Sequence, residues 1–265
     1  MHLHSQISGH GEPIIILHGL LGSLDNWHTI SRKLADHFRV CALDQRNHGN
    51  SPHSPEMDYP VMAGDVLEFM DREGLPLAHV LGHSMGGKTA MQFALLHPHR
   101  VNKLVVVDIT PRRYEPFHSA LFDALLSLDL RAFKSRKEVE EALAAPIPDL
   151  ATRRFLLKNL RADSQSGLSW KLGLHEIHQN YDRLSEPVEG NRPFMGPVLF
   201  IRGADSPYLR EEDWPAIRTL FPQAQLCIIP GASHWVHADR AGPFLEAVLQ
   251  FLAPISDKST LTAFA

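Results

Sequence analysis

One short segment of the chain contains a serine that could act as a nucleophile. Ser84 is the central residue of a Gly-His-Ser-Met-Gly run over residues 82–86. An apolar stretch ends at Leu81, and a stretch with helical periodicity begins near Met85. Two Gly and one Ser at these offsets occur by chance in about one chain in ten of this length, so the inference depends on the flanking elements. A serine on a tight turn between a strand and a helix is typical of a nucleophile elbow.

The glycines beside this serine have a mechanical role in such a turn. The turn forces the serine backbone into a strained conformation, and side chains at the flanking positions would collide. We therefore expect Gly82 and Gly86 to relieve the crowding around Ser84.

A second glycine-containing run follows the apolar stretch 14–17. It reads His-Gly-Leu-Leu-Gly over residues 18–22. The run could be only a tight turn, but it also fits an oxyanion loop. In that case the backbone N–H of Leu20 joins that of Met85 to hold the charge developing on an ester oxygen. Removal of one such donor typically costs about 2.7–4 kcal/mol of transition-state stabilisation.

The general base of a nucleophile elbow follows the serine in the chain, in the order Ser, acid, His. His234 lies in a Gly-Ala-Ser-His-Trp run, after the last apolar stretch and before the last predicted helix. A loop at this place can bring an imidazole beside Ser84. His237 is the competitor, but its place at a helix start favours a capping or surface role.

Two aspartates that end apolar stretches after Ser84 are candidates for the acid. Asp108 follows the stretch 104–107, and Asp205 follows the stretch 198–202. The acid commonly lies three residues beyond a Gly after the later strand, but that position is Ser206. Asp108 lies at the carboxyl edge next to the nucleophile strand, where open α/β sheets have their sites. We therefore prefer Asp108, with Asp205 as the alternative.

Six apolar runs alternate with helical patterns along the chain. The runs are rich in Val, Ile and Leu and do not alternate with polar residues, which is typical of strands buried on both faces of a mostly parallel sheet. The predicted strands cover residues 14–17, 40–43, 79–81, 104–107, 198–201 and 226–229. The predicted helices cover residues 26–35, 59–73, 85–96, 214–221 and 240–252. The pattern predicts an α/β fold with helices on both faces.

Residues 111–193 interrupt this alternation with helical periodicity and no convincing buried strand. We interpret them as a helical cap inserted into a core domain of residues 1–110 and 194–255. Apolar residues gather on one broad face of the first cap helix, and we expect them to line the substrate cleft: Phe117, Leu121, Phe122 and Leu125. A later cap helix, carrying Leu150, Phe155, Leu156 and Leu160, has a second apolar face.

The composition excludes several other classes of protein. The 265 residues are 44% apolar and 21% charged, which is close to the globular average. A net charge of -4 gives no overall attraction to nucleic acid, and no apolar run approaches the roughly 18 residues of a membrane span. Two cysteines, Cys41 and Cys227, are too few for a disulfide scaffold. We expect a cytoplasmic protein with reduced thiols, a flexible tail at residues 256–265, and neither metal nor organic cofactor.

At the candidate nucleophile, base and acid and in the run 18–22, the chain resembles the α/β-hydrolase family. Within that family, four runs are similar to those of small bacterial esterases of the YbfF type. They are Leu-Asp-Gln-Arg-Asn-His-Gly-Asn-Ser at residues 43–51, the run 82–88, Ser-Pro-Tyr at 206–208, and His-Trp-Val-His at 234–237. The resemblance implies a serine esterase that acts on carboxylic esters, with acyl-thioesters as further substrates. It also implies that Asp108 is the acid, and that Arg46 and His48 brace a loop near the site.

The residues and the resemblance together predict one mechanism and leave two other classes of function open. In that mechanism His234 takes the Ser84 proton, and Asp108 fixes the imidazole tautomer while the hydroxyl attacks a small-molecule ester. A non-catalytic receptor on the same fold is one alternative. A carbon–carbon bond hydrolase or a peptidase on the same scaffold is the other. The sequence does not predict an oligomeric state.

Overall fold

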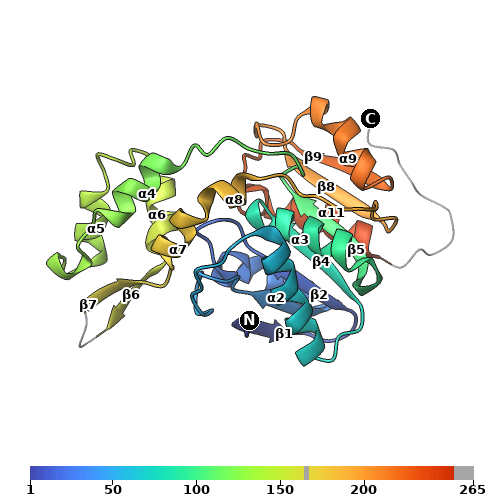
Figure 1. The fold of residues 1–265 in the computed structure, drawn as a ribbon, viewed down its shortest axis with the longest axis horizontal. Coiled ribbons are helices and arrows are strands. Elements are labelled where there is room, and N and C mark those ends of the chain that lie inside the picture. Colours follow the sequence, from blue (N-terminus) through green and yellow to red (C-terminus); the bar gives the residue numbers. More distant parts are fainter. Residues whose placement is uncertain (164–166, 254–265) are drawn as a thin grey trace.

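A seven-stranded sheet forms the centre of the molecule (Figure 1) in the computed structural model, which describes residues 1–163 and 167–253. Its strands follow the order β1-β3-β2-β4-β5-β8-β9. Their bounds are β1 Ser5–Ser8, β2 Pro13–Leu17, β3 Arg39–Leu43, β4 Ala78–His83, β5 Val101–Val107, β8 Val198–Gly203 and β9 Ala224–Ile229. All neighbouring strands run parallel except β1, which pairs antiparallel with β3. The six predicted strands are confirmed.

Helices cover both faces of this sheet, as the continuous apolar runs predicted. The helices that pack against it are α1 His28–Leu34, α2 Tyr59–Arg72, α3 Met85–Leu96, α9 Trp214–Leu220 and α11 Ala241–Leu252. Helices α2, α3 and α9 contribute to one core, and α1 and α11 contribute to the other. The predicted fold class is therefore confirmed.

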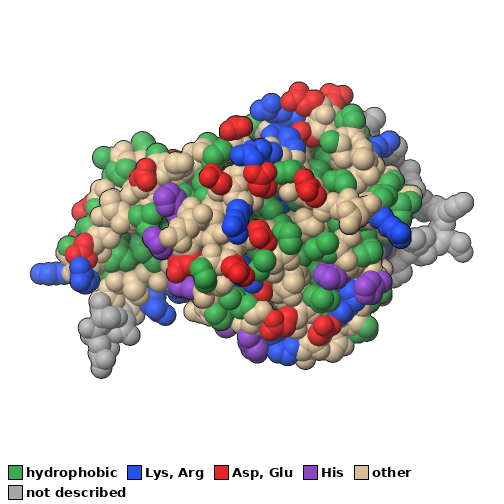
Figure 2. All heavy atoms as spheres, viewed as in Figure 1, with side chains coloured by type: hydrophobic (Ala, Val, Ile, Leu, Met, Phe, Trp, Pro, Cys, Tyr) green, Lys and Arg blue, Asp and Glu red, His purple; other side chains and the backbone are tan. Residues whose placement is uncertain are grey.

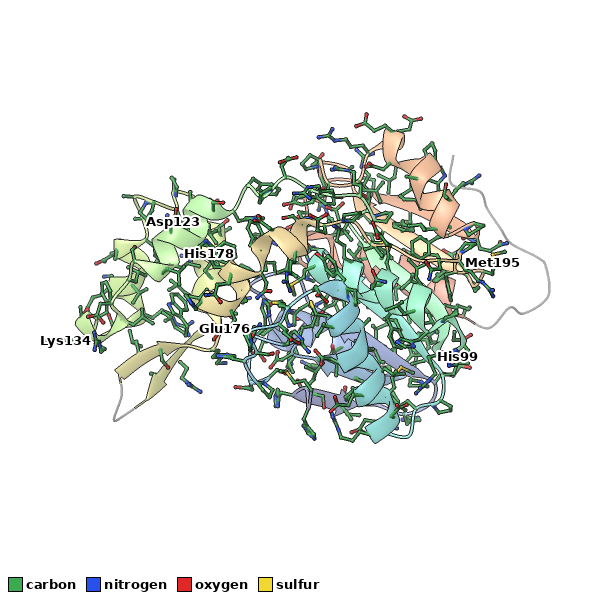
Figure 3. All side chains as sticks on the ribbon, in the orientation of Figure 1. His99, Asp123, Lys134, Glu176, His178 and Met195 are labelled. Atoms are coloured by element: carbon green, nitrogen blue, oxygen red, sulfur yellow. The ribbon has the colours of Figure 1, made fainter. Side chains whose placement is uncertain are left out.

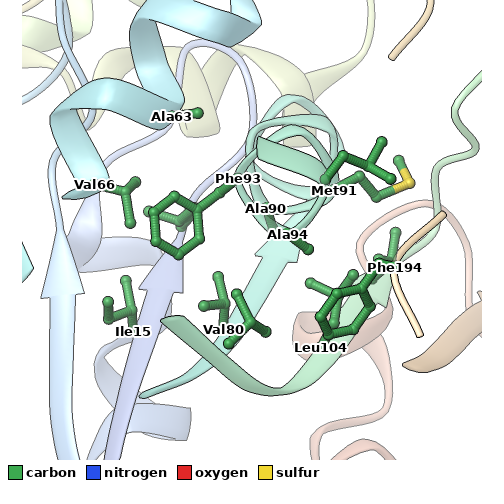
Figure 4. Close-up of a cluster of buried hydrophobic side chains, with 14 of the residues drawn as sticks. Ile15, Ala63, Val66, Val80, Ala90, Met91, Phe93, Ala94, Leu104 and Phe194 are labelled. Carbon is green, nitrogen blue, oxygen red and sulfur yellow. The ribbon is translucent and has the colours of Figure 1, made fainter. Parts of the chain in front are cut away.

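Strand β2 illustrates why both cores need apolar strands. Its alternate residues face opposite sides, so that Ile15 and Leu17 join one core while Ile14 and Ile16 join the other. Figure 4 shows the first of these cores, where Phe93 and Ala90 of α3 pack over Ile15 and Val80 of the sheet. Each fully buried Val, Ile or Phe side chain of this core contributes about 1.5–3 kcal/mol.

Most of residues 111–193, which we call the cap, lies to one side of the sheet in Figure 1, and the end of this segment returns to the sheet domain, where Val188 is buried. The cap contains α4 Ser119–Leu126, α5 Arg136–Ala142, α6 Leu150–Leu157, α7 Leu174–Gln179 and α8 Tyr181–Ser185. It has its own apolar core, which also includes Met62 and Met85 of the sheet domain. Lys134 lies at the end of the cap farthest from the sheet, and Met195 lies at the opposite end of the molecule (Figure 3).

The structure corrects the expectation of a purely helical cap. Strands β6 Leu160–Asp163 and β7 Gly167–Trp170 form an antiparallel pair between α6 and α7. The sequence did not predict them because each strand has only four residues and neither shows a long apolar run. The predicted core and cap boundaries remain predictions, and the expected tail at residues 256–265 lies outside the described residues.

Shorter helical turns complete the connections. They are η1 Leu24–Trp27, η2 Pro98–Arg100, η3 Leu130–Ala132, η4 Glu211–Asp213 and α10 Val236–Asp239. The two cysteines are free, with Cys41 buried and Cys227 half-buried. Acidic and basic side chains are interspersed over the face in Figure 2, and neither sign forms a large patch there.

Candidate active site

Ser84 lies at the junction of β4 and α3 in a strained backbone conformation. Its φ is 54° and its ψ is -120°, a region that residues other than glycine rarely adopt. The Ser84 N–H donates to the carbonyl of Val107 at 3.1 Å, which ties the turn to β5. A Cβ on Gly82 would collide with the Gly86 carbonyl, and one on Gly86 would collide with the Leu17 carbonyl. The two glycines therefore have the mechanical role that the sequence predicted.

Ser84 lines a small cavity of about 70 Å³ between the sheet domain and the cap. Leu20 and Met85, the two predicted oxyanion residues, line the same cavity. Met85 is the first residue of α3, so its N–H has no acceptor within the helix. The remaining lining residues are Tyr59, Lys88, Ile109, Tyr114, Glu115, Phe117, His118, Tyr181, Leu184, Ser185 and Tyr208.

His234 and Asp108 contact each other at the carboxyl edge of the sheet. The Nδ1 atom of His234 lies 2.7 Å from Oδ2 of Asp108. A carboxylate oxygen can only accept at this contact, so the imidazole carries its proton on Nδ1 and Nε2 has a lone pair that can accept a proton. The backbone of Asp108 is also strained, with a φ of 51°.

The Asp108 carboxylate is fully buried and receives two further hydrogen bonds. The Gly203 N–H donates to Oδ1 at 3.1 Å, and the Ser206 hydroxyl donates to Oδ2. Ser206 thus supports the carboxylate from the position where an acid is common in other chains of this type. Asp205 is exposed, and its contact with the neighbouring loop is made by its backbone N–H, which donates to Ala232.

Two aromatic side chains hold the His234 imidazole and its loop. The Tyr208 ring stacks on the imidazole, with centroids 3.8 Å apart and planes inclined by 19°. Nε2 of His83 lies 2.9 Å from the backbone carbonyl of His234, which makes His83 the donor. Burial lowers the pKa of His83 well below its usual value, and the neighbouring His234 and His237 lower it further. His83 is therefore a neutral donor that fixes the loop.

His237 does not have the surface or capping role that the sequence predicted. Its side chain is buried and stacks on Trp27, with ring centroids 4.1 Å apart. The reason is that α10 packs inward against the second core, where Val236 is also buried. Burial lowers the pKa of His237 to about 3, and the nearby His234 adds to this effect.

The loop at residues 18–22, predicted to form the oxyanion hole, is braced from both the sheet domain and the cap. The Leu21 N–H donates to Nε2 of His48 at 3.1 Å, and Nδ2 of the buried Asn159 donates to the Leu21 carbonyl at 2.8 Å. Leu21 needs this support because its φ is 57°. Burial lowers the pKa of His48 to about 3, so it is the neutral acceptor that this contact requires.

Arg46 was expected to brace a loop near the site, and its guanidinium donates to the Glu56 carbonyl in the loop before α2. Arg46 makes a bidentate ion pair with Asp65 at 2.7 and 2.8 Å, and both side chains are buried.

Only Phe117 of the four predicted cleft residues lines the cavity that contains Ser84. Phe122 and Leu125 are fully buried in the cap core, and Leu121 is half-buried against it. Helical periodicity identified the apolar face of α4 correctly, but this face packs mainly inside the cap. Periodicity cannot separate a core face from a cleft face, because both require the same residue types.

Two aromatic residues at this site have roles that the sequence did not predict. Tyr208 belongs to one of the runs that carry the family resemblance, but its stacking on His234 requires the loop after β8 to fold over the imidazole. His118 lies in the cavity lining and shares a hydrogen bond with the Tyr181 hydroxyl at 2.5 Å. Burial lowers the pKa of His118 to about 4, with a smaller contribution from His234.

Neither a metal cluster nor a membrane span is found in residues 1–163 and 167–253. Within these ranges no three His, Cys, Asp or Glu side chains gather in a way that could hold a metal ion. The helices in the same ranges are all too short or too polar to cross a membrane.

A model of the alpha/beta hydrolase fold matches residues 12–241 of the sequence. The chain belongs to the α/β-hydrolase family. The esterase YbfF of Escherichia coli strain K12 is 33% identical, and the match covers 94% of this chain and 96% of that protein. The family resemblance predicted from the sequence is thus confirmed.

Other α/β-hydrolase relatives have names that describe ester hydrolysis. The sn-1-specific diacylglycerol lipase ABHD11 of Xenopus laevis is 38% identical, with 91% of this chain and 80% of that protein covered. A solved structure described as a marine microorganism esterase is 42% identical with a TM-score of 0.92, and the match covers 94% of this chain and 99% of the other. The predicted enzyme class is confirmed, and the chain is a carboxylic ester hydrolase.

Proposed function

We propose that the protein is a serine esterase of short to medium acyl esters, with Ser84 as nucleophile, His234 as general base and Asp108 as the acid. The observation that supports this proposal is the His234–Asp108 hydrogen bond beside a cavity lined by Ser84. An imidazole held by a buried carboxylate and a serine on a strained turn are the parts that nucleophilic acyl transfer needs.

In the first half of the reaction, Nε2 of His234 accepts the hydroxyl proton as Ser84 attacks the ester carbonyl. Asp108 keeps the other imidazole proton on Nδ1 and stabilises the imidazolium that forms. The imidazolium then donates its proton to the leaving alcohol, and an acyl-enzyme remains on Ser84.

In the second half, a water molecule replaces the alcohol. His234 takes a proton from this water as it attacks the acyl-enzyme, and the same proton returns to Ser84 when the acid is released. The negative charge on the carbonyl oxygen in both halves is held by the backbone N–H groups of Leu20 and Met85. Such preorganised donors are a large part of the catalysis by this class of enzyme.

The size of the cavity and its lining favour a limited acyl chain. A volume of about 70 Å³ has room for a few carbon atoms beyond the carbonyl. Most of the lining is apolar or aromatic, so each buried methylene contributes about 0.8 kcal/mol until the space is full. Acyl-thioesters fit the same chemistry because the attack on the carbonyl is unchanged.

The decisive experiment is a panel of aryl esters of graded acyl length, assayed with Ser84→Ala and His234→Ala. Each variant should lose about 10⁶ in kcat, because the two side chains act as a unit. Circular dichroism and thermal melting should show that both variants are folded. Turnover close to that of the wild type in either folded variant would contradict the assignment of nucleophile and base.

The same panel separates the alternative functions. A non-catalytic receptor would bind the esters without releasing acid. A peptidase or a carbon–carbon bond hydrolase would turn over amides or diketones faster than the matched esters. The cytoplasmic location and the absence of nucleic-acid and membrane partners stay predictions from the sequence.

A further inference from the structure

The cavity beside Ser84 contains a buried lysine that the proposed mechanism does not use. Lys88 lies one helical turn after Ser84 on α3, and its side chain is only 2% exposed. Lysine is almost never fully buried unless an opposite charge pairs with it. In the described part of the chain, no carboxylate forms an ion pair with Lys88.

The ammonium group of Lys88 is held by neutral partners. It donates to the backbone carbonyls of Glu186 at 2.6 Å and Ser185 at 3.4 Å, and it lies over the rings of Tyr59 and Tyr114 at 5.3 and 5.1 Å. An ammonium has three N–H donors, so these two carbonyls leave one N–H available. Dipoles and ring faces stabilise the charge only in part, since burial lowers the pKa of Lys88 to about 7.

Lys88 is the only lysine or arginine among the described residues that line the cavity, so an anion there would meet its ammonium. Arg112 and Arg113 both lower the pKa of Lys88, and Glu186 opposes them. Both carboxylates near these arginines are already paired, Asp213 with Arg112 and Glu186 with Arg113. Glu115 also lines the cavity, but it is exposed to solvent.

We propose that Lys88 binds a carboxylate of the substrate, so that the preferred substrates are esters that carry an anionic group close to the scissile bond. This inference rests on the proposed function, because it requires the substrate ester to lie at Ser84. A carboxylate would supply the partner that the buried ammonium lacks, and such a charge-assisted hydrogen bond is stronger than a neutral one.

The position of Lys88 limits the length of such a substrate. Ser84 and Lys88 line the same cavity of about 70 Å³, so a substrate that reaches both must be short. Dicarboxylates of four to six carbons cover a graded series of short lengths. Monoesters of succinate, glutarate and adipate are therefore suitable probes for a carboxylate on the acyl side. Esters of glycolate with a neutral acid probe the alcohol side.

The test compares each anionic ester with a neutral ester of the same length, in which a primary amide replaces the free carboxylate. In the wild type at pH 6.5, kcat/KM should be about 10 to 100 times higher for the anionic member of one of these pairs. Lys88→Met should reduce this ratio to about one. The side that shows the preference, acyl or alcohol, identifies the part of the substrate that carries the carboxylate.

Gln92 provides a matched control for a purely structural role of Lys88. It lies one turn further along α3, is buried, and donates to the Glu189 carbonyl at 2.8 Å without lining the cavity. Gln92→Met removes a similar hydrogen bond between α3 and the end of the cap. It should leave the ratio of kcat/KM for the anionic and neutral esters at the wild-type value.

A measurement on the unmodified enzyme keeps the inference testable if Lys88→Met does not fold. Free glutarate should inhibit neutral-ester hydrolysis competitively, at least tenfold more strongly than glutaramide. Equal inhibition by glutarate and glutaramide would show that Lys88 only joins α3 to the cap by hydrogen bonds. A kcat/KM ratio near one for anionic and neutral esters in the wild type would show the same. The proposed function would fail differently. In that case the wild type would hydrolyse no ester, or Ser84→Ala would hydrolyse esters as fast as the wild type.

Discussion

At the scale of single residues, the support given to Asp108 accounts for the absence of an acid at position 206. The buried carboxylate receives hydrogen bonds from Gly203, Ser206 and His234. An unpaired buried carboxylate would be very costly, and these three donors compensate for its loss of solvent. A second carboxylate in place of Ser206 would remove a donor and add repulsion. A serine at this position is therefore consistent with an acid directly after β5.

This arrangement predicts different effects for the two candidate acids. Asp108→Asn should reduce kcat by about 10⁴, because the amide no longer enforces the imidazole tautomer. Asp205→Asn should change kcat far less, since the Asp205 side chain is exposed. Initial rates with one good aryl ester measure both effects. The opposite ranking of the two variants would transfer the role of the acid to Asp205.

At the scale of secondary-structure elements, the strands and helices of the sheet domain were predictable because they are buried on both faces. Runs such as 104–107 contain only apolar residues, and a short run of this kind between turn residues is typical of a buried strand. Helix α3 begins and ends at the predicted residues. Strand β1 was missed because it is an edge strand with exposed Gln6 and Ile7, so no apolar run marks it.

The candidate site was predictable where a motif constrains the backbone and less so where packing decides. Ser84 and the two glycines beside it follow from sterics that any chain must satisfy. The positions of His237 and Phe122 depend on which neighbour covers them, Trp27 in one case and Tyr181 in the other. No local pattern encodes a neighbour that is more than fifty residues away.

Helix α4 allows a test of how the cap limits acyl length. Phe117, just before this helix, lines the cavity and is 58% exposed, so Phe117→Ala should enlarge the available space at little cost in stability. The acyl length with the highest kcat/KM should then increase, since each additional buried methylene contributes about 0.8 kcal/mol.

Phe122→Ala is the matched control in the same segment. Phe122 is fully buried in the cap core and does not line the cavity. Its truncation should therefore cost about 3–5 kcal/mol of stability without moving the acyl-length optimum. A wild-type profile that rises steadily into long acyl chains, or a Phe117→Ala profile identical to it, would show that this ring does not limit the substrate.

At the scale of the whole molecule, the loops that hold the site depend on buried neutral imidazoles. His48 accepts from the Leu21 N–H in the loop at residues 18–22, and His83 donates to the His234 carbonyl. His18 accepts from the Gln45 N–H at 3.0 Å, and burial lowers its pKa to about 4. Protonation would disrupt each acceptor contact and place a charge in the core. The integrity of the site and the stability of the fold should therefore decline together in acid.

The direction of this pH dependence follows from the proton balance. The folded-state pKa values of His18, His48 and His237 lie at about 4, 3 and 3, below the unfolded value of about 6.5. Between these limits the unfolded chain binds more protons, so the free energy of unfolding falls as the pH falls below about 6.5. Each such histidine contributes a slope of about 1.4 kcal/mol per pH unit below pH 6.5. Above pH 6.5 the histidine is neutral in both states, and none of this stability is lost.

Urea unfolding of the wild type and two variants between pH 7.5 and 5 tests this dependence. His237→Phe keeps an aromatic ring against Trp27 and removes one buried base whose Nδ1 has no hydrogen-bond partner in the described structure. Its free energy of unfolding should decline less steeply below pH 6.5, by about 1.4 kcal/mol per pH unit. His99→Gln alters an exposed histidine and should retain the wild-type slope. Identical slopes in the wild type and His237→Phe would mean that His237 does not take up a proton on unfolding in this range, and the link between its burial and acid sensitivity would be wrong.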